Sequence, residues 1–360
     1  MKIAIIDADL IGRKRHRFPN LVCMKLSGYH KNQGDSVMLK TDYDSLMSFD
    51  KVFIAKVFTD TPIPDGELFG NILELPNVEY GGTGFFYDKA VPLPNEIEHC
   101  KPDYHLYDEW LAEKDKGGAE FKCYKDYSIG FLTRGCFRHC SFCVNRRSSE
   151  VRKHSPLAEF LDTSRKKICL LDDNFFGYRD WKKSLQELLD ANKPFHFKQG
   201  LDVRLLDEEK ASSLFKARYD GDFIFAFDDI RDAPIIEGKL KLIRQHTNKN
   251  AKFYVLCGYD RRGKYDKDFW KADILGTFER IRILKKHKNT LPYIMRHENY
   301  LRSPYRGMYI TIAEWCNVPQ VFKKLGFREF CYSRKNCKSR GIYLEKFLRE
   351  NSISENEICG

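Results

Sequence analysis

The sequence predicts an α/β protein whose main part is an incomplete (β/α)6 TIM-type barrel. A small open-sheet α/β domain precedes the barrel, and a short basic helical extension follows it. Three observations predict this organisation. The chain has 360 residues, which is more than one compact domain usually holds. Its first part reads as strand, helix, strand and strand, as in an open α/β sheet. From residue 127 onward, short β-branched or aromatic runs alternate with helical segments.

The open-sheet domain is expected over residues 1–125. Its predicted elements are a strand over Lys2–Ile6, a helix that follows Pro19, and strands over Ser36–Lys40 and Lys51–Val57. A loop-rich section with several prolines and glycines comes next. Gly117-Gly118 is the clearest signal for a linker, so we expect the first domain to end close to it.

The barrel is expected over residues 126–300, because six strand-then-helix units follow one another there. The predicted strands are Tyr127–Leu132, Ile168–Leu171, Phe195–Lys198, Phe223–Phe227, Phe253–Cys257 and Leu291–Met295. Consecutive units of this kind require right-handed parallel crossovers. Six units predict an open barrel whose reactive end is where the strands finish. Residues 301–360 are basic and aromatic and are expected to form the helical extension.

The composition excludes several classes of protein. Hydrophobic residues make up 42% of the chain and charged residues 31%, so a substantial core can form. No apolar run approaches the ~20 residues of a membrane helix, and Asp7 and Asp9 interrupt the first apolar run before a signal peptide could form. A disulfide scaffold would be shorter and denser in cysteine than this chain with its 12 cysteines. We therefore expect a soluble, cytoplasmic protein with no membrane partner.

The positive charge is concentrated near the C-terminus. The formal net charge is +11, and residues 260–349 hold 22 Lys or Arg but only 9 Asp or Glu. The basic stretches are Arg280–Lys288 and Lys323–Arg340, the second with Phe327, Phe330 and Tyr332 interleaved. Such a region suits a nucleic acid or another anionic substrate. Solvated helix faces would give the same count, so both interpretations stay open.

The sharpest signal is a set of three cysteines in the spacing C-x3-C-x2-C. Cys136, Cys140 and Cys143 follow the first predicted barrel strand, where such a fold performs its chemistry. Three thiolates within eight residues can bind three irons of a 4Fe–4S cluster and leave the fourth iron open to a substrate. Two alternatives stay open: a zinc site of three cysteines with His139 or His154, and a trio of thiols without metal.

This cysteine loop resembles the hallmark of the radical S-adenosylmethionine superfamily, including the aromatic Phe142 just before the last cysteine. The resemblance covers about residues 127–295. It implies that the three cysteines hold a 4Fe–4S cluster and that S-adenosylmethionine chelates the open iron. One electron, from a reductant of the flavodoxin or ferredoxin type, would then cleave S-adenosylmethionine to a 5′-deoxyadenosyl radical. No catalytic residue beyond the cluster is assigned, and the substrate and the later reaction stay open.

Other strand ends carry residues that the resemblance places near S-adenosylmethionine. These candidates are Asp172, Asp173 and Asn174 after the second strand, Gln199 and Arg204 after the third, Asp228 after the fourth and Gly258 after the fifth. Carboxylates suit the methionine ammonium, and a guanidinium suits its carboxylate or a ribose. A glycine permits close approach of adenine. Helix caps, turns and surface salt bridges are the alternative roles of these side chains.

The first domain resembles the Rossmann-like cobalamin-binding domains of one branch of this superfamily. The Asp-x-His-x-x-Gly motif that binds cobalamin is missing, since Asp9 is followed by Leu-Ile-Gly and neither His16 nor His30 has the required spacing. Cobalamin is therefore a possible cofactor but not a favoured one. The loop Gly81-Gly82-x-Gly84 could approach a phosphate, although such a loop is more often a turn.

Two further functions remain as alternatives to an enzyme. One is a zinc-stabilised nucleic-acid-binding module without catalysis, and the other is an iron–sulfur redox sensor that holds the cluster without cleaving S-adenosylmethionine. The C-terminal cysteines could also form a second metal site, although their spacing matches no standard ligand pair; they are Cys316, Cys331, Cys337 and Cys359.

Overall fold

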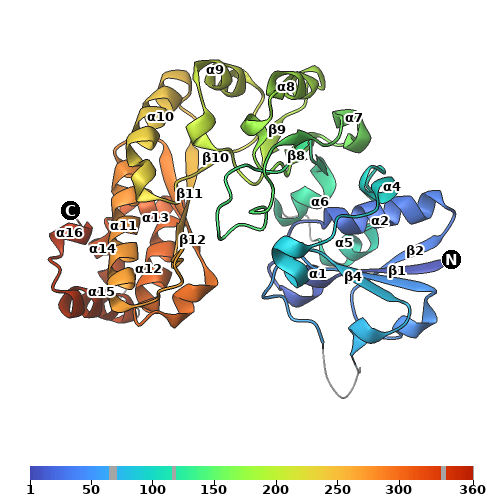
Figure 1. The fold of residues 1–360 in the computed structure, drawn as a ribbon, viewed down its shortest axis with the longest axis horizontal. Coiled ribbons are helices and arrows are strands. Elements are labelled where there is room, and N and C mark those ends of the chain that lie inside the picture. The colour runs from blue at the N-terminus through green and yellow to red at the C-terminus, as the bar shows by residue number, and fades with distance from the viewer. Residues whose placement is uncertain (65–70, 116–118, 334–337, 360) are drawn as a thin grey trace. The chain divides into compact units, whose positions relative to one another are not determined.

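The computed structural model describes residues 1–64, 71–115, 119–333 and 338–359 (Figure 1). They form two compact units, Met1–His196 and Phe197–Gly360, and each is described by itself. The expected linker at Gly117-Gly118 lies outside the described residues, and the predicted division into three domains stays a prediction. None of the helices in the described parts of the chain has both the length and the apolar character that crossing a membrane requires.

The first unit begins with a parallel four-stranded sheet in the order β2-β1-β3-β4. Its strands are β1 (Lys2–Asp7), β2 (Ser36–Lys40), β3 (Lys51–Ala55) and β4 (Val78–Gly81). The first three confirm the predicted strands, whereas β4 was not predicted. The continuous apolar sequence of β1 is buried on both faces, as the central strand of a parallel sheet requires. Ile3 and Ile5 pack on one face, and Ala4 and Ile6 pack on the other.

Helix α2 (Leu21–Asn32) confirms the helix predicted after Pro19. Its N-cap is Asn20, whose side-chain oxygen accepts hydrogen bonds from the amides of Val22 and Cys23. The short helix α1 (Ala8–Gly12) directly follows β1. Four smaller helices follow β4 and lead to the second half of the unit; they are α3 (Thr83–Phe86), α4 (Asn95–Glu98), α5 (Asp108–Lys114) and α6 (Lys122–Asp126).

A second parallel sheet carries the cysteine loop. Its strands are β5 (Tyr127–Gly130), β8 (Lys167–Leu170) and β9 (Phe195–Phe197), in that order, and all three were predicted. Just after β5, the short antiparallel strands β6 (Thr133–Arg134) and β7 (Arg152–Lys153) pair with each other. They bring together the two ends of the segment that contains the three cysteines. Helices α7 (Leu157–Phe160) and α8 (Trp181–Asp190) complete this part.

The second unit contains a third parallel sheet in the order β10-β11-β12. Its strands β10 (Phe223–Ala226), β11 (Ala251–Cys257) and β12 (Thr290–Arg296) confirm the last three predicted strands. One face of this sheet is buried, whereas the opposite face is apolar but open: Tyr293 is 38% and Met295 44% exposed. The six strands are thus present in two parallel sheets, and the six-stranded barrel itself stays a prediction.

In the second unit, the helices α9 (Glu208–Lys216), α10 (Ala233–His246) and α11 (Lys267–Lys285) alternate with the strands. The other helices follow β12 and form the C-terminal part; they are α12 (Arg306–Cys316), α13 (Pro319–Lys324), α14 (Phe327–Tyr332), α15 (Lys338–Asn351) and α16 (Asn356–Cys359). Both α11 and α12 contact β12.

Some of the basic and aromatic residues near the C-terminus are buried in the core. Arg280 is 3% exposed, and its guanidinium donates to the backbone carbonyls of Phe227, Asp228 and Leu256. Phe327 and Phe330 are also buried, so their rings cannot stack on nucleic-acid bases. Of the aromatic residues predicted for this role, Tyr332 is the exposed one, at 50%.

Candidate functional site

The cysteine loop occupies the segment between β6 and β7, and its entrance requires a glycine. Gly135 has φ +97°, a left-handed conformation that residues with a Cβ rarely adopt. A Cβ at this position would also lie 2.3 Å from the carbonyl oxygen of Glu150. The chain at the start of the loop therefore passes directly against the chain at its end.

The carboxylate of Asp172, at the end of β8, fixes the approach to the loop. Asp172 is fully buried and accepts hydrogen bonds from the amides of Leu132 (3.2 Å) and Thr133 (2.7 Å) and from the Thr133 hydroxyl (2.7 Å). Burial raises the pKa of Asp172 to about 7. These bonds hold the backbone between β5 and β6, directly ahead of the first cysteine.

Asp173 and Asn174 contact the loop itself. The Asp173 carboxylate accepts from the Gly135 amide and from Nδ2 of Asn145, each at 2.7 Å. Nδ2 of Asn174 donates to Sγ of Cys136 at 3.4 Å, whereas its Oδ1 is buried and has no hydrogen-bond partner among the described residues. A buried acceptor without a donor is costly, so Asn174 Oδ1 offers a place for the donor group of a ligand.

The three cysteines are half-buried, reduced thiols on one loop. The Cys143 amide donates to the Cys140 carbonyl (2.9 Å), and the Asn145 amide donates to Sγ of Cys143 (3.4 Å). Burial raises the pKa of Cys143, and the nearby thiols of Cys140 and Cys136 raise it further. Because closely spaced thiolates repel one another, a bound cation would stabilise them together. The donor set, with N–H groups directed at two sulfurs, fits a 4Fe–4S cluster.

The arrangement of ligands that a single metal ion requires differs from the arrangement that a cluster requires. Within the described residues, no three His, Cys, Asp or Glu side chains are arranged to hold one metal ion. In a 4Fe–4S cluster each cysteine binds a different iron, so the sulfurs need not converge on one point. Of the histidines considered for zinc, His154 contacts Glu98 through Nε2 (3.1 Å) and Ser155 through Nδ1 (2.8 Å). His139 contacts the Arg146 carbonyl through Nδ1 at 2.9 Å, and the zinc alternative stays untested.

Phe142, another predicted site residue, lies in the cysteine loop itself, and the remaining predicted site residues lie in the second unit. Gln199 is exposed. Arg204 forms ion pairs with Asp202 (2.8 Å) and Asp232 (2.9 Å), so the salt bridge considered from the sequence is present. Asp228 accepts a hydrogen bond from the Leu256 amide at 3.0 Å, and burial raises its pKa.

Gly258 has φ +77°, and a Cβ there would lie 2.9 Å from Cβ of Tyr300. Close approach at this glycine is therefore already made by the chain's own Tyr300. The Gly258 amide donates to the Asp273 carboxylate at 2.7 Å, and the Tyr309 hydroxyl donates to the same carboxylate oxygen at 2.7 Å. Asp273 was missed from the sequence because it lies inside the amphipathic pattern of α11. A carboxylate three residues after the buried Trp270 was the available signal.

The carboxyl edge of the first sheet, where a cobalamin would bind, is filled by the chain's own polar groups. The crevice between β1 and β3 is where an open α/β sheet reverses its strand order and binds ligands. Here the buried Asp9 carboxylate accepts from the amides of Val57 (2.7 Å) and Phe58 (3.4 Å) and from the Thr61 hydroxyl (2.5 Å). Asp9 thereby joins the segments after β1 and β3. These paired groups do not fit insertion of part of a cobalamin between the strands, in keeping with the missing histidine motif.

Glu98, Lys25 and His154 form a half-buried polar link between α4, α2 and the residue after β7. The Glu98 carboxylate lies 2.8 Å from Nζ of Lys25 and 3.1 Å from Nε2 of His154. Burial alone would raise the pKa of Glu98, but hydrogen bonds from His154 and Lys25 outweigh it and lower the pKa to about 2. The charged carboxylate therefore stabilises the folded chain.

We expect Glu98→Gln to lower the free energy of unfolding at pH 7 by about 2 kcal/mol, because the buried Lys25 ammonium loses its counter-charge. The folded-state pKa lies below the ordinary value of 4.5, so this contribution is complete above pH ~4.5 and lost as the pH falls toward 2. Urea unfolding of both proteins between pH 3 and 7 measures it. A difference that stays constant over this range would contradict the assignment.

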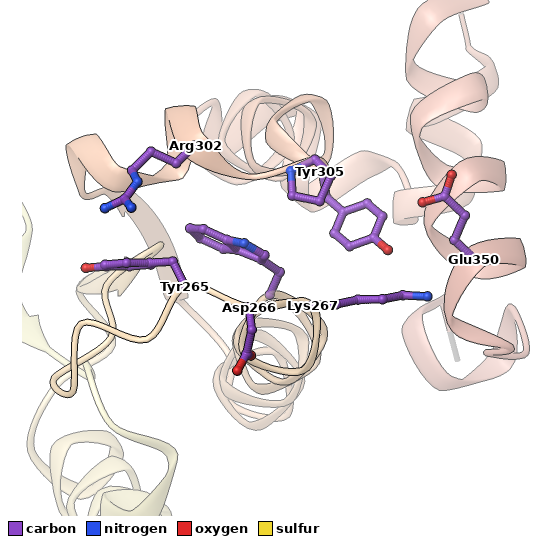
Figure 2. Close-up of a pocket in the computed structure, with 8 residues that line it drawn as sticks. Tyr265, Asp266, Lys267, Arg302, Tyr305 and Glu350 are labelled. Carbon is purple, nitrogen blue, oxygen red and sulfur yellow. The ribbon is translucent and has the colours of Figure 1, made fainter.

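The second unit contains a cavity of about 540 Å³ (Figure 2). Its lining residues are Tyr265, Asp266, Lys267, Trp270, Arg302, Pro304, Tyr305 and Glu350. The Arg302 guanidinium lies over the Tyr265 ring, 4.8 Å from its centre. Within the described residues, neither Lys267 nor Arg302 forms an ion pair. The lining of the cavity therefore carries two cations, Lys267 and Arg302, and two carboxylates, Asp266 and Glu350.

The C-terminal cysteines are distributed without a common site in the described residues. Cys316 and Cys331 are each 1% exposed, and burial raises the pKa of Cys316. Cys337 and the side chain of Cys359 lie outside the described residues. A second metal site stays a prediction.

Comparison with known proteins identifies the fold. A scan against protein-family models finds no match, and no curated protein matches the sequence. The radical S-adenosylmethionine methyltransferase TsrM from Kitasatospora setae is similar in structure. Its structure with cobalamin and a [4Fe-4S] cluster has a TM-score of 0.53 and 13% identity, over 82% of this chain and 72% of that chain. Its structure with tryptophan substrate and the analogue aza-SAM has a TM-score of 0.52 and 14% identity, over 81% and 72%. The chain therefore has the fold of a radical S-adenosylmethionine enzyme with a cobalamin-binding-like N-terminal domain.

Proposed function

We propose that this protein is a radical S-adenosylmethionine enzyme in which Cys136, Cys140 and Cys143 hold a 4Fe–4S cluster. The observation that carries the proposal is the cysteine loop: three thiols lie on one loop closed by β6 and β7, and N–H groups are directed at two of the sulfurs. The fold of TsrM supports the same function. When bound, the cluster and S-adenosylmethionine would supply a 5′-deoxyadenosyl radical.

The chain's own residues would orient and shield that chemistry. The Asn145 amide and Nδ2 of Asn174 donate toward cysteine sulfurs, which stabilises thiolates without occupying an iron. The unpartnered Oδ1 of Asn174 is suited to accept from the methionine ammonium. The Asp172 and Asp173 carboxylates hold the loop backbone, so we infer that they act through the loop's geometry.

The predicted contacts from the second unit belong to the same proposal. We infer that the six predicted strands form the incomplete barrel. The polar residues at the carboxyl ends of its strands would then reach S-adenosylmethionine. Arg204 is among these residues, and its guanidinium pairs with Asp202 and Asp232.

The experiment is anaerobic reconstitution with iron and sulfide, followed by dithionite and S-adenosylmethionine. About four irons per chain and release of 5′-deoxyadenosine are expected. A colourless protein with one zinc per chain would instead support the zinc-stabilised nucleic-acid-binding module. A cluster that releases no 5′-deoxyadenosine with any cell fraction would support the redox sensor. Labelled S-adenosylmethionine added to RNA, DNA and protein fractions would reveal methylation, the reaction type named for TsrM.

An anionic substrate, with a nucleic acid favoured, is proposed for the second unit because the cavity in Figure 2 offers Lys267 and Arg302. We expect the double variant Lys267→Gln, Arg302→Gln to bind whole-cell RNA more weakly. The slope of log affinity against log salt should become less steep by about 1.5, because two phosphate contacts are lost.

The matched control is Lys323→Gln, Lys324→Gln on α13, which removes the same charge from two exposed positions. An equal effect of both double variants would show general attraction to a basic surface and would remove the cavity from the proposal.

A further inference from the structure

Tyr87 and Asp88, which directly follow α3, contact the cysteine loop from the N-terminal domain. The Tyr87 hydroxyl donates to the backbone carbonyl of Phe142 at 2.5 Å. The amide of the same peptide unit, that of Cys143, donates to the Cys140 carbonyl at 2.9 Å. Both polar groups of the peptide between Phe142 and Cys143 therefore form hydrogen bonds. These bonds fix the orientation of this peptide and restrict the position of the Cys143 side chain.

Asp88 holds the other side of the loop. Its carboxylate accepts from Nε of Arg146 and from Nε of Arg147, each at 2.7 Å, and its side chain is only 5% exposed. These two arginines lower the pKa of Asp88 to about 2, so it is charged at any physiological pH. Arg146 in turn donates through Nη1 to the Ser141 carbonyl at 3.2 Å. One carboxylate thus supports the arc from Cys140 to Cys143 through an arginine.

The glycine-rich loop explains how these two residues reach the cysteines. Gly82 has φ +107°, and a Cβ there would lie 2.3 Å from the Lys56 carbonyl oxygen. A Cβ at Gly84 would lie 2.6 Å from Cγ of Lys56, and its amide donates to the same carbonyl at 2.9 Å. The glycines therefore seat α3 against the end of β3. A phosphate is not needed to account for them.

We propose that Tyr87 and Asp88 are positioning residues that hold the cysteine loop in the conformation in which its thiolates receive the cluster. The proposal rests on the proposed function and adds a role for the N-terminal domain, as the support of the cluster loop independently of cobalamin. The physical reason is conformational entropy: a loop of this length samples many conformations, and contacts that restrict it in advance favour binding.

The experiment compares Tyr87→Phe and Asp88→Asn with the wild-type chain, each reconstituted anaerobically. Loss of cluster iron to a chelator should be about fivefold faster in each variant, the factor expected for one hydrogen bond. The change that S-adenosylmethionine causes in the electron paramagnetic resonance spectrum of the reduced cluster should broaden or disappear. Asp88→Glu, which keeps the charge, should restore part of the stability.

Two control variants have matched chemistry away from the loop. Tyr80→Phe removes a hydroxyl from a tyrosine that is 41% exposed. Asp60→Asn removes a carboxylate that pairs with Arg13 at 2.6 Å. Both should behave like the wild-type chain. Thermal unfolding of each apoprotein separates a local effect from general unfolding, and Tyr87→Phe is the decisive variant where Asp88→Asn lowers stability throughout.

A further measurement needs no cluster. In the apoprotein, alkylation of Cys140 and Cys143, followed by mass spectrometry, should be faster in the variants than in the wild-type chain. Wild-type rates of alkylation and of iron loss in both variants would overturn the positioning role and leave the proposed function standing. A wild-type chain that binds no 4Fe–4S cluster would instead overturn the proposed function, and the positioning role with it.

Discussion

Cys140→Ala should reduce the iron bound after reconstitution from about four per chain to near zero and abolish release of 5′-deoxyadenosine. Two remaining thiolates cannot hold a cubane that already lacks a fourth protein ligand. Cys140 is also the first residue of the turn in which its carbonyl accepts the Cys143 amide. Iron and sulfide assays and the absorbance near the visible charge-transfer bands measure the loss.

The control for this variant is Cys100→Ala. Cys100 is a half-buried thiol outside the loop, and its Sγ contacts the Lys25 carbonyl at 3.1 Å. Its replacement should leave iron content and cleavage unchanged. Full iron content in Cys140→Ala would contradict both the radical enzyme and the iron–sulfur redox sensor, since both require this cysteine.

Gly135→Ala should lower cluster occupancy to below about a tenth of the wild-type value, the result of roughly 1.4 kcal/mol or more of loop destabilisation. The alanine would have to adopt a left-handed φ, and its methyl group would lie 2.3 Å from the carbonyl oxygen of Glu150. The chain can relieve this contact by moving the two ends of the cysteine loop apart. That movement would also lengthen the hydrogen bond from the Gly135 amide to Asp173.

Gly34→Ala separates the effect of the left-handed backbone conformation from the effect of the close contact with Glu150. Gly34 also has a left-handed φ, +82°, but an added Cβ there meets no atom within 4 Å. It should cost about 1 kcal/mol of unfolding free energy through the backbone alone and leave the cluster intact. Thermal unfolding and iron content of both variants measure the comparison. Equal iron content in Gly135→Ala and the wild-type chain would show that the loop tolerates a wider entrance.

Much of the fold could be predicted from short sequence segments. The strands β1, β2 and β3 were predicted, as were the six strands β5, β8, β9, β10, β11 and β12. The clearest of them, β1 and β3, are buried parallel strands, which are continuous apolar runs. The strand β4 was missed, since Glu79 and Tyr80 are exposed and Gly81 ends it. The pair β6 and β7 was missed for a similar reason: each has two residues, and three of the four are charged.

In the candidate site, too, some features could be predicted from the sequence and others could not. Asp172, Asp173 and Asn174 were predicted to contact S-adenosylmethionine, and this role stays a prediction. In the structure Asp173 and Asn174 contact the cysteine loop, and Asp172 binds the backbone just before it. Arg280 shows the opposite case. It was counted as surface charge, whereas its guanidinium is buried among three carbonyls. Its position inside the protein depends on how α11 packs against the ends of β10 and β11, which no local pattern encodes.

The sequence alone determined the chemistry that this protein can offer: three sulfur donors within eight residues, on a loop that follows a buried strand. Donor type and spacing are properties of a short stretch of chain, so they need no knowledge of the fold. Only the tertiary structure decided what holds that loop. Asp88 and Arg146 lie 58 residues apart, and their contact exists because the glycine-rich loop seats α3 against the end of β3. Such a contact depends on the path of the whole chain between the two residues.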